Sequence, residues 1–131
     1  MNAFFSIQAD PARDLVKIKL KGFFTPAALQ AFKDERRIVH QQLRCGPNQH
    51  LSLADTREIG IQSQEMVAQF HGMLADPSYR SRKLAFVVAS SLARMQLMRA
   101  IGSRTAQCFT DPVEAEEWLL AEDDQRIASV A

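Results

Sequence analysis

The chain has 131 residues, of which 47% are hydrophobic and 24% charged, as is ordinary for a single globular domain. Its formal net charge of +1 argues against a dedicated nucleic-acid-binding protein, because such proteins carry a marked basic excess. The sequence shows neither the ~20-residue apolar run that crosses a bilayer nor the features of a signal peptide. We therefore expect one cytoplasmic domain over residues 1–131, with fraying from about Asp123.

The first two predicted elements are strands that form a hairpin. Phe4–Ala9 alternates with the period of two that is typical of a strand. Asp10–Asp14 is rich in turn residues, and Leu15–Lys21 alternates again, with a lysine at every second position. We expect an antiparallel pair whose lysine face is exposed to solvent.

The next three elements are a helix, a strand and a helix. Thr25 and Pro26 form a helix start, and the Gly-Pro pair at 46–47 ends that helix. His50–Asp55 is the third strand, and Gln62–Ala75 is the second helix. The apolar residues of this second helix gather on one face; they are Met66, Val67, Phe70, Met73 and Leu74.

Leu84–Ala89 is an unbroken apolar run, which is typical of a strand buried on both faces. We expect Phe86, Val87 and Val88 to lie in the core. A third helix follows and stops at Gly102, Thr105–Thr110 is a fifth strand, and a last helix begins at Pro112. The order β-β-α-β-α-β-α-β-α predicts an α/β fold: a mixed five-stranded sheet with about four helices, whose last three strands are parallel.

The third helix has two apolar stripes instead of one. One of them must face the sheet; the other either packs against a neighbouring helix or forms an exposed patch for a partner or ligand. On the second interpretation we expect a homodimer with this helix near its centre. The candidate interface residues are Leu92, Arg94, Met95, Met98 and Arg99.

Two serines precede the third helix. In the first interpretation the two serines cap the N-terminus of that helix. In the second they form part of an anion- or ligand-binding site at the helix N-terminus, beside the end of the third strand. Arg57, at the end of the third strand, could instead serve only as an ion-pair partner of Asp55 or Glu58. The candidate site residues are Asp55, Thr56, Arg57, Ser90 and Ser91.

Metal and cofactor chemistry have little support in the sequence. His40, His50 and His71 do not stand at metal-ligand spacing from one another or from a cysteine or carboxylate. Cys45 and Cys108 do not form a zinc or redox pair. Glycine-rich nucleotide-binding loops and nucleophile elbows are absent as well. We predict no metal, no cofactor and no enzyme activity.

A hydrolase remains a lower-ranked alternative to a non-catalytic protein. It requires a histidine within hydrogen-bonding distance of a serine, so that the imidazole can accept the hydroxyl proton. The residues that would have to meet are His40, His50 or His71 with Ser63, Ser90 or Ser91.

Four segments carry a resemblance to a known family. They are Leu20–Gly22, Leu51–Asp55, Leu84–Val88 and the closing segment Phe109–Leu119, which is the most distinctive. On these segments the chain resembles the STAS superfamily, and within it the single-domain bacterial branch that is similar to anti-sigma-factor antagonists. The resemblance implies a STAS-like fold and a regulator that binds a protein or a ligand.

The resemblance also implies a candidate phosphorylation site. Antagonists of this family carry a phosphorylated serine in an Asp-Ser-Ser-Gly-like motif at the start of the second helix. The corresponding stretch here is Ile61–Glu65, in which Ser63 falls near the phosphoacceptor position. The Asp and Gly of the motif are missing. We expect Ser63 to be exposed at a helix N-terminus.

Two functions therefore stand beside each other. The first is a non-catalytic regulatory module for protein interaction, resembling the antagonists. The alternative is a binder of a small apolar or anionic, lipid-like ligand in a pocket between the second and third helices, since lipid-binding folds of similar topology exist. A pocket in the structure would favour the alternative.

Overall fold

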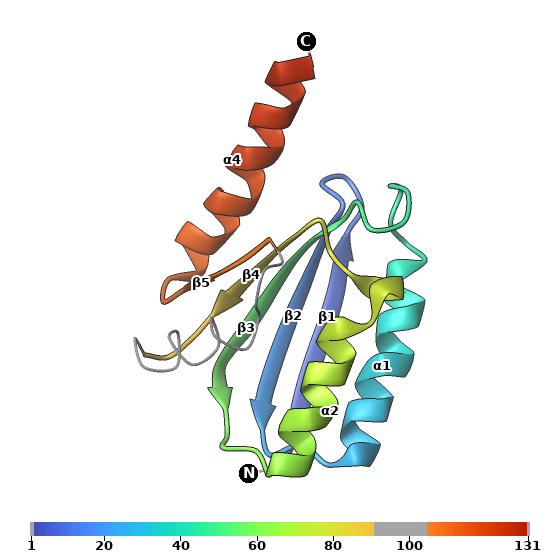
Figure 1. The fold of residues 1–131 in the computed structure, drawn as a ribbon, viewed down its shortest axis with the longest axis vertical. Helices are drawn as coiled ribbons and strands as arrows, with labels where there is room; N and C mark the ends of the chain where they lie inside the picture. Colours follow the sequence, from blue (N-terminus) through green and yellow to red (C-terminus); the bar gives the residue numbers. More distant parts are fainter. Residues whose placement is uncertain (1, 91–104, 131) are drawn as a thin grey trace.

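The computed structural model describes residues 2–90 and 105–130, with side chains up to residue 121 (Figure 1). The helix predicted after Ser91 and all five candidate interface residues lie outside the described residues. The described elements are β1 (Phe4–Asp10), β2 (Leu15–Gly22), α1 (Pro26–His40), β3 (Leu51–Ile59), α2 (Gln64–Ala75), the short 3-10 helix η1 (Pro77–Tyr79), β4 (Lys83–Val87), β5 (Ala106–Phe109) and α4 (Pro112–Val130).

The five strands form one mixed sheet in the order β1-β2-β3-β4-β5. β1 and β2 are antiparallel, with Phe4 opposite Lys21, whereas β2, β3, β4 and β5 run parallel to one another. This arrangement confirms the predicted α/β class and the predicted sheet. Three α-helices are present in the described part of the chain, and α4 continues past Asp123 to Val130. The predicted fraying there stays a prediction.

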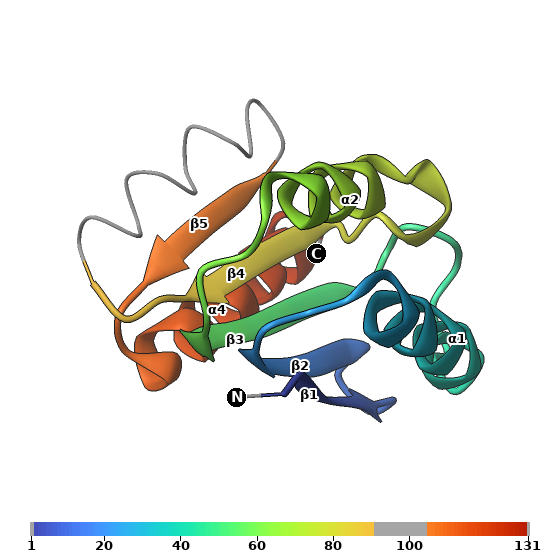
Figure 2. The same cartoon turned by 90° about the horizontal axis from the view of Figure 1, so that it is seen from below.

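Helices cover both faces of the sheet. Figure 2 shows α1 and α2 on one side of it and α4 on the other. The side chains of each strand alternate between these two faces. In β4, Ala85 and Val87 pack toward α4, while Leu84 and Phe86 point to the opposite face. We call these two sides the α4 face and the α2 face.

The central strand is buried as the sequence predicts. Phe86, Val87 and Val88 are 6%, 0% and 3% exposed. The α4 face is tightly closed: Leu15, Leu51, Ala85 and Val87 from the sheet meet Ala115 and Leu119 from α4, and all six are fully buried.

The first helix is shorter than predicted. Thr25 does cap it, its hydroxyl accepting a hydrogen bond from the Ala28 N–H. However, α1 ends at His40 and does not reach the Gly-Pro pair. The reason lies in the β1–β2 turn, where the Asp14 carboxylate accepts hydrogen bonds from the backbone N–H groups of Arg44 and Cys45. Because these two N–H groups bond to the turn, they are not available to continue the helix. The helix therefore ends before Arg44.

The third strand is longer than predicted. It runs to Ile59 because its polar end still pairs with β2, where Glu58 lies opposite Lys21. Between the Lys19–Asp55 and Lys21–Glu58 pairs, β3 contains one extra residue, which is a β-bulge. The bulge shifts the alternation of side chains, so that Asp55 and Glu58 both face the lysines of β2. The other element boundaries differ from the prediction by one or two residues.

Candidate functional site

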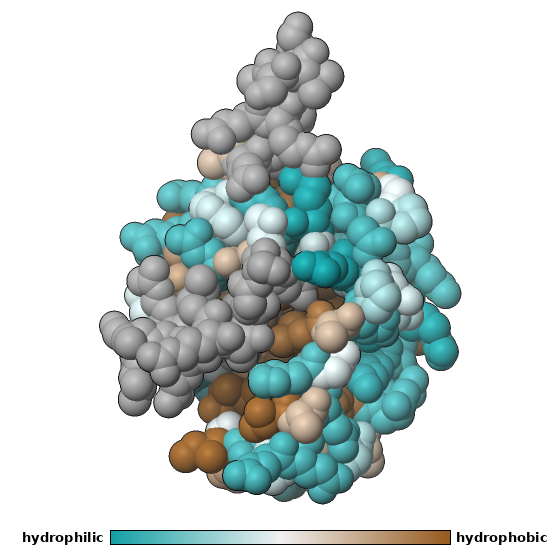
Figure 3. Space-filling view, in the orientation of Figure 1, coloured by the Kyte–Doolittle hydropathy of each residue, from teal (hydrophilic) through white to brown (hydrophobic). Residues whose placement is uncertain are grey.

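A cavity of about 470 Å³ lies on the α2 face of the sheet. β2, β3 and β4 supply its floor, α2 one wall, and α1 with η1 one end. In Figure 3 apolar side chains are visible in the hollow beside α2. We call this space the sheet cavity. Its apolar lining includes Ile18, Leu20, Ala54, Phe86 and Val88 from the strands and Val67, Phe70, Met73 and Leu74 from α2.

The apolar face of α2 lies over this cavity. Of the five apolar residues that the sequence places on one face of the helix, only Met66 is fully buried, at 3% exposed. Phe70, Met73 and Leu74 are half-buried, and Val67 is 42% exposed. The helix therefore packs Met66, Phe70 and Met73 against the core that it shares with α1, and the same apolar face also borders the cavity.

Arg36 of α1 lines the polar end of the sheet cavity. Its guanidinium carbon lies 3.9 Å from the centre of the Tyr79 ring, a stacked cation–π arrangement. Its Nη2 is 3.9 Å from a carboxylate oxygen of Asp76, which is too far for a hydrogen bond. The buried Nε of Arg36 has no hydrogen-bond partner. Burial lowers the pKa of Arg36, although an arginine remains protonated at neutral pH.

His40 lies one helical turn further along α1. Its ring is 5.1 Å from the ring of Tyr79 and 4.6 Å from the ring of His50, centre to centre. Burial, and then the charge of Arg36, lower the pKa of His40 to about 4. His40 is therefore neutral at physiological pH and adds no positive charge beside Arg36.

Loop contacts hold this polar end together. The Asn48 side chain donates to the carbonyl oxygens of Pro77 and Arg80, at 2.8 and 2.9 Å. The Asp76 carboxylate accepts from the Ser78 N–H and so caps η1. These bonds place Tyr79 over the end of α1.

Arg36 was not among the predicted site residues, although the sequence carries a signal for it. Arg36 falls four residues after Phe32 and three before Val39, on the buried stripe of α1. A charged residue on an apolar stripe is such a signal.

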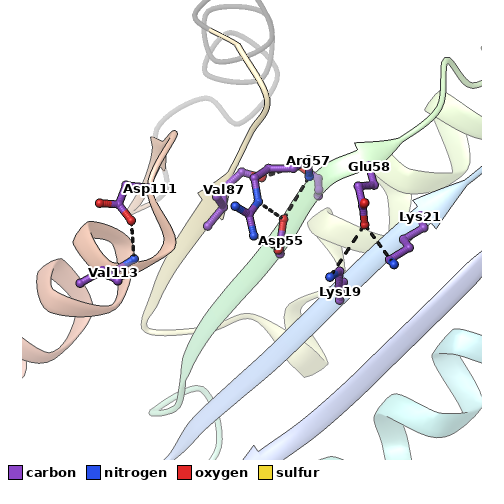
Figure 4. Close-up of polar contacts among 9 residues, drawn as sticks. Lys19, Lys21, Asp55, Arg57, Glu58, Val87, Asp111 and Val113 are labelled. Carbon is purple, nitrogen blue, oxygen red and sulfur yellow. Dashed lines mark hydrogen bonds and ion pairs between the residues drawn. The ribbon is translucent and has the colours of Figure 1, made fainter.

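Of the predicted anion-site residues, Thr56 and Arg57 line the sheet cavity, near the end of β3, whereas Asp55 and Ser90 are not among its lining residues. Figure 4 shows Asp55 and Arg57 together at this end of β3. Arg57 donates to both carboxylate oxygens of Asp55, at 3.0 and 2.8 Å. This hydrogen-bonded arginine lowers the pKa of Asp55. The Thr56 hydroxyl donates to the Val87 carbonyl at 3.0 Å. Arg57 therefore forms an ion pair with Asp55.

Anion binding at this end stays a prediction. Ser90 is exposed, and Ser91 lies outside the described residues. Glu58 makes contacts of 3.8 and 3.1 Å with Lys19 and Lys21, so these two lysines face a carboxylate (Figure 4).

Ser63 is exposed and forms the N-cap of α2, as expected. Its hydroxyl accepts a hydrogen bond of 3.2 Å from the Met66 N–H. The preceding Gln62 ties this helix start to the end of β2, because its amide accepts from the Phe24 N–H and donates to the carbonyls of Gly22 and Gly60. Phosphorylation of Ser63 stays a prediction.

Ser63 lies far from the three histidines of the hydrolase alternative. His50 precedes β3 and Ser63 follows it, so the nine residues of the strand, roughly 30 Å, separate them. His40 lies beside His50, so it is similarly far from Ser63. His71 lies two turns along α2 from Ser63, roughly 12 Å away.

Residues 2–90 and 105–121 contain no group of three histidine, cysteine, aspartate or glutamate side chains that could hold a metal ion. Within the same part of the chain, every helix is too short or too polar to cross a membrane.

Comparisons with known proteins identify the fold. No protein-family model matches the chain, and no curated protein is similar in sequence. A solved structure is similar: an uncharacterized protein of the DUF3478 family, with a SpoIIAA-like fold, from Shewanella loihica PV-4. The similarity covers 89% of this chain and 94% of that one, with a TM-score of 0.70 and 13% sequence identity. The chain therefore has the SpoIIAA-like fold of STAS domains, as its sequence resemblance implied.

Proposed function

We propose that this protein is a non-catalytic binding module that takes a small, mainly apolar ligand in the sheet cavity. The observation that carries the proposal is the cavity itself: about 470 Å³, within the range of roughly 300–1,000 Å³ of small-molecule sites. Its floor and one wall are apolar, with a few polar groups at each end. This matches the usual composition of ligand sites.

The placement of α2 supports the same function. An apolar helix face over an empty space leaves dispersion contacts unmade on both sides. A ligand with an apolar body restores those contacts and removes the lining side chains from water. The predicted alternative placed the ligand between the second and third helices; the sheet cavity lies between α2 and the sheet.

The test uses a neutral apolar probe, N-phenyl-1-naphthylamine, whose fluorescence rises in an apolar site. We expect saturable binding to the native protein. Ala54→Phe, which extends a side chain from the cavity floor, should weaken binding at least tenfold. Val113→Phe is the matched control, because Val113 is 61% exposed on α4 and should leave binding unchanged.

A second variant approaches the cavity from its wall. Met73 is half-buried on α2, so Met73→Glu should fold and still repel an apolar probe by placing a charge in the site. If the native protein does not bind the probe, or if both variants bind it as well as the native protein does, the proposal is wrong.

A second candidate function is regulatory protein interaction at the start of α2. The observation that favours it is a pair of apolar side chains near Ser63: Ile61 is 92% exposed and Phe23 52% exposed. Phe23 also packs against Gly60, where an added Cβ would lie 2.8 Å from its ring. Exposed apolar residues beside a phosphorylatable serine would make binding of a partner sensitive to phosphate charge.

Mass spectrometry tests the phosphorylation on which this candidate function depends. Intact-mass spectra of protein from its native host should show a phosphate adduct that Ser63→Ala removes. The absence of this adduct would leave Ser63 as a helix cap only.

The predicted homodimer is tested by light scattering, where Met95→Glu combined with Met98→Glu should halve the mass. A native protein that is monomeric at high concentration contradicts it.

A further inference from the structure

One charged side chain is buried at the edge of the sheet cavity without an adequate partner. Arg36 is 8% exposed, and it lines the cavity. Burying an ionised group is costly unless hydrogen bonds and an opposite charge compensate it. A buried arginine therefore calls for an account of where its five N–H donors go.

The contacts of the described residues leave that account incomplete. The ring of Tyr79 covers one face of the guanidinium group but accepts no hydrogen bond from it. Asp76 lies beyond hydrogen-bond distance at 3.9 Å, and its side chain is 37% exposed. The Nε of Arg36 remains without an acceptor. His40, which lies beside Tyr79 at this end, is neutral at physiological pH and supplies no negative charge for Arg36.

We propose that Arg36 binds the anionic headgroup of an amphipathic ligand, a carboxylate or phosphate monoester whose apolar tail lies in the sheet cavity. This inference rests on the proposed function and names the ligand class. The planar guanidinium group matches the paired oxygens of a carboxylate or phosphate. The Tyr79 ring, 3.9 Å from the guanidinium carbon, restricts the movement of the Arg36 side chain, which reduces the entropy that binding would otherwise cost.

The tail has a continuous apolar path from Arg36. Ile18 of β2 and Phe86 of β4 lie level with each other on the floor, since both are in register with Ala54, and Leu20 lies further along β2. Phe70 and Met73 of α2 lie along the same path. An unbranched alkyl chain fits this lining, because methylene groups gain from burial without requiring hydrogen bonds.

The experiment compares three ligands with one alkyl chain: decanoate, decyl phosphate and decanol. Their affinities are measured by displacement of the neutral probe from the native protein. We expect both anions to bind at least tenfold more tightly than decanol, and the tighter of the two identifies the headgroup. Acetate and inorganic phosphate, which lack a tail, should not displace the probe.

The matched variants are Arg36→Met and Arg37→Met. Methionine retains contact with Tyr79 but has no charge, and Arg37 is the exposed neighbour on α1. Arg36→Met should weaken decanoate and decyl phosphate at least tenfold and leave decanol unchanged, whereas Arg37→Met should change none of them. In the native protein, decanoate should shift the Arg36 Nε–H resonance and decanol should not. This readout applies even if a variant fails to fold.

The outcomes separate this inference from the proposed function. If all three ligands bind equally and Arg36→Met has no effect, the headgroup assignment is wrong and the apolar site stands. If the Arg36 Nε–H resonance does not move with a bound anion, the assignment is wrong as well. If neither the neutral probe nor any ligand binds, the proposed function itself fails.

Discussion

The two faces of the sheet are built from the same strands but packed differently. On the α4 face, six side chains from the sheet and α4 are fully buried and in contact. On the α2 face, apolar side chains of similar size surround a cavity of about 470 Å³. The comparison shows that apolar content does not by itself decide how a face is used. Both faces hold buried core side chains, but the α2 face also retains space at the cost of packing contacts.

The largest expected effect is at Phe86, the floor residue that both belongs to the core and lines the cavity. Phe86→Ala should lower the free energy of unfolding by about 3–5 kcal/mol, because a large buried ring is lost from the central strand. Urea denaturation measures this. An unchanged midpoint would show that the α2 face contributes little to stability even at its centre.

A matched pair of truncations compares the two helices directly. Leu119→Ala on α4 should cost about 2–5 kcal/mol, because Leu119 is fully buried in a closed core. Met73→Ala on α2 should cost less than about 1 kcal/mol, because its side chain already borders empty space. Equal costs in denaturant titrations would contradict the difference between the faces.

Two substitutions that enlarge an alanine, one on each face, test the same difference in packing. Ala85 of β4 faces α4 and is fully buried, whereas Ala54 of β3 faces the cavity. Ala85→Leu should destabilise by about 1–3 kcal/mol through overpacking. Ala54→Leu should cost less than about 1 kcal/mol, since its added atoms enter the cavity. Thermal unfolding of the two variants measures the difference, and a larger loss for Ala54→Leu would contradict it.

A further expected effect is a pH dependence that belongs to the α2 face. The pKa of His40 is lowered from 6.5 to about 4. Above pH 6.5 the histidine is neutral in both states and contributes nothing. As the pH falls from 6.5 to 4, the unfolded chain binds a proton that the folded chain excludes, so stability decreases.

His40→Gln tests this dependence. It should flatten the fall in stability between pH 6.5 and 4, whereas His71→Gln, on the exposed side of α2, serves as the control. The measurement is the urea midpoint at several pH values. A native slope that survives in His40→Gln would contradict the assignment of this dependence to His40.

Much of the fold follows from local patterns in the sequence. The alternation in β1 and β2, the apolar run of β4 and the caps at Thr25 and Ser63 are decided by neighbours within a few residues, so they can be predicted without knowledge of the fold. The order of these elements then restricts the sheet to a small number of topologies. The exposure of Ser63 follows from the same local rule, because a helix cap lies where the chain enters the helix.

The errors occur where distant residues compete with local patterns. α1 stops early because Asp14, some thirty positions away, accepts the N–H groups of Arg44 and Cys45. β3 runs past Asp55 because the lysines of β2 pair with Glu58. In both cases a contact across the fold overrides the residues that locally indicate an end.

The candidate binding site belongs to the tertiary structure alone. The sequence shows that Arg36 lies on the apolar stripe of α1, but the stacking of Tyr79 over it depends on how η1 returns across the end of that helix. Likewise, the period of α2 determines which of its residues are apolar and adjacent, but not whether they meet a filled core or a cavity. That outcome depends on the distance at which α2 crosses the sheet, which is set by the summed volumes of side chains on several elements.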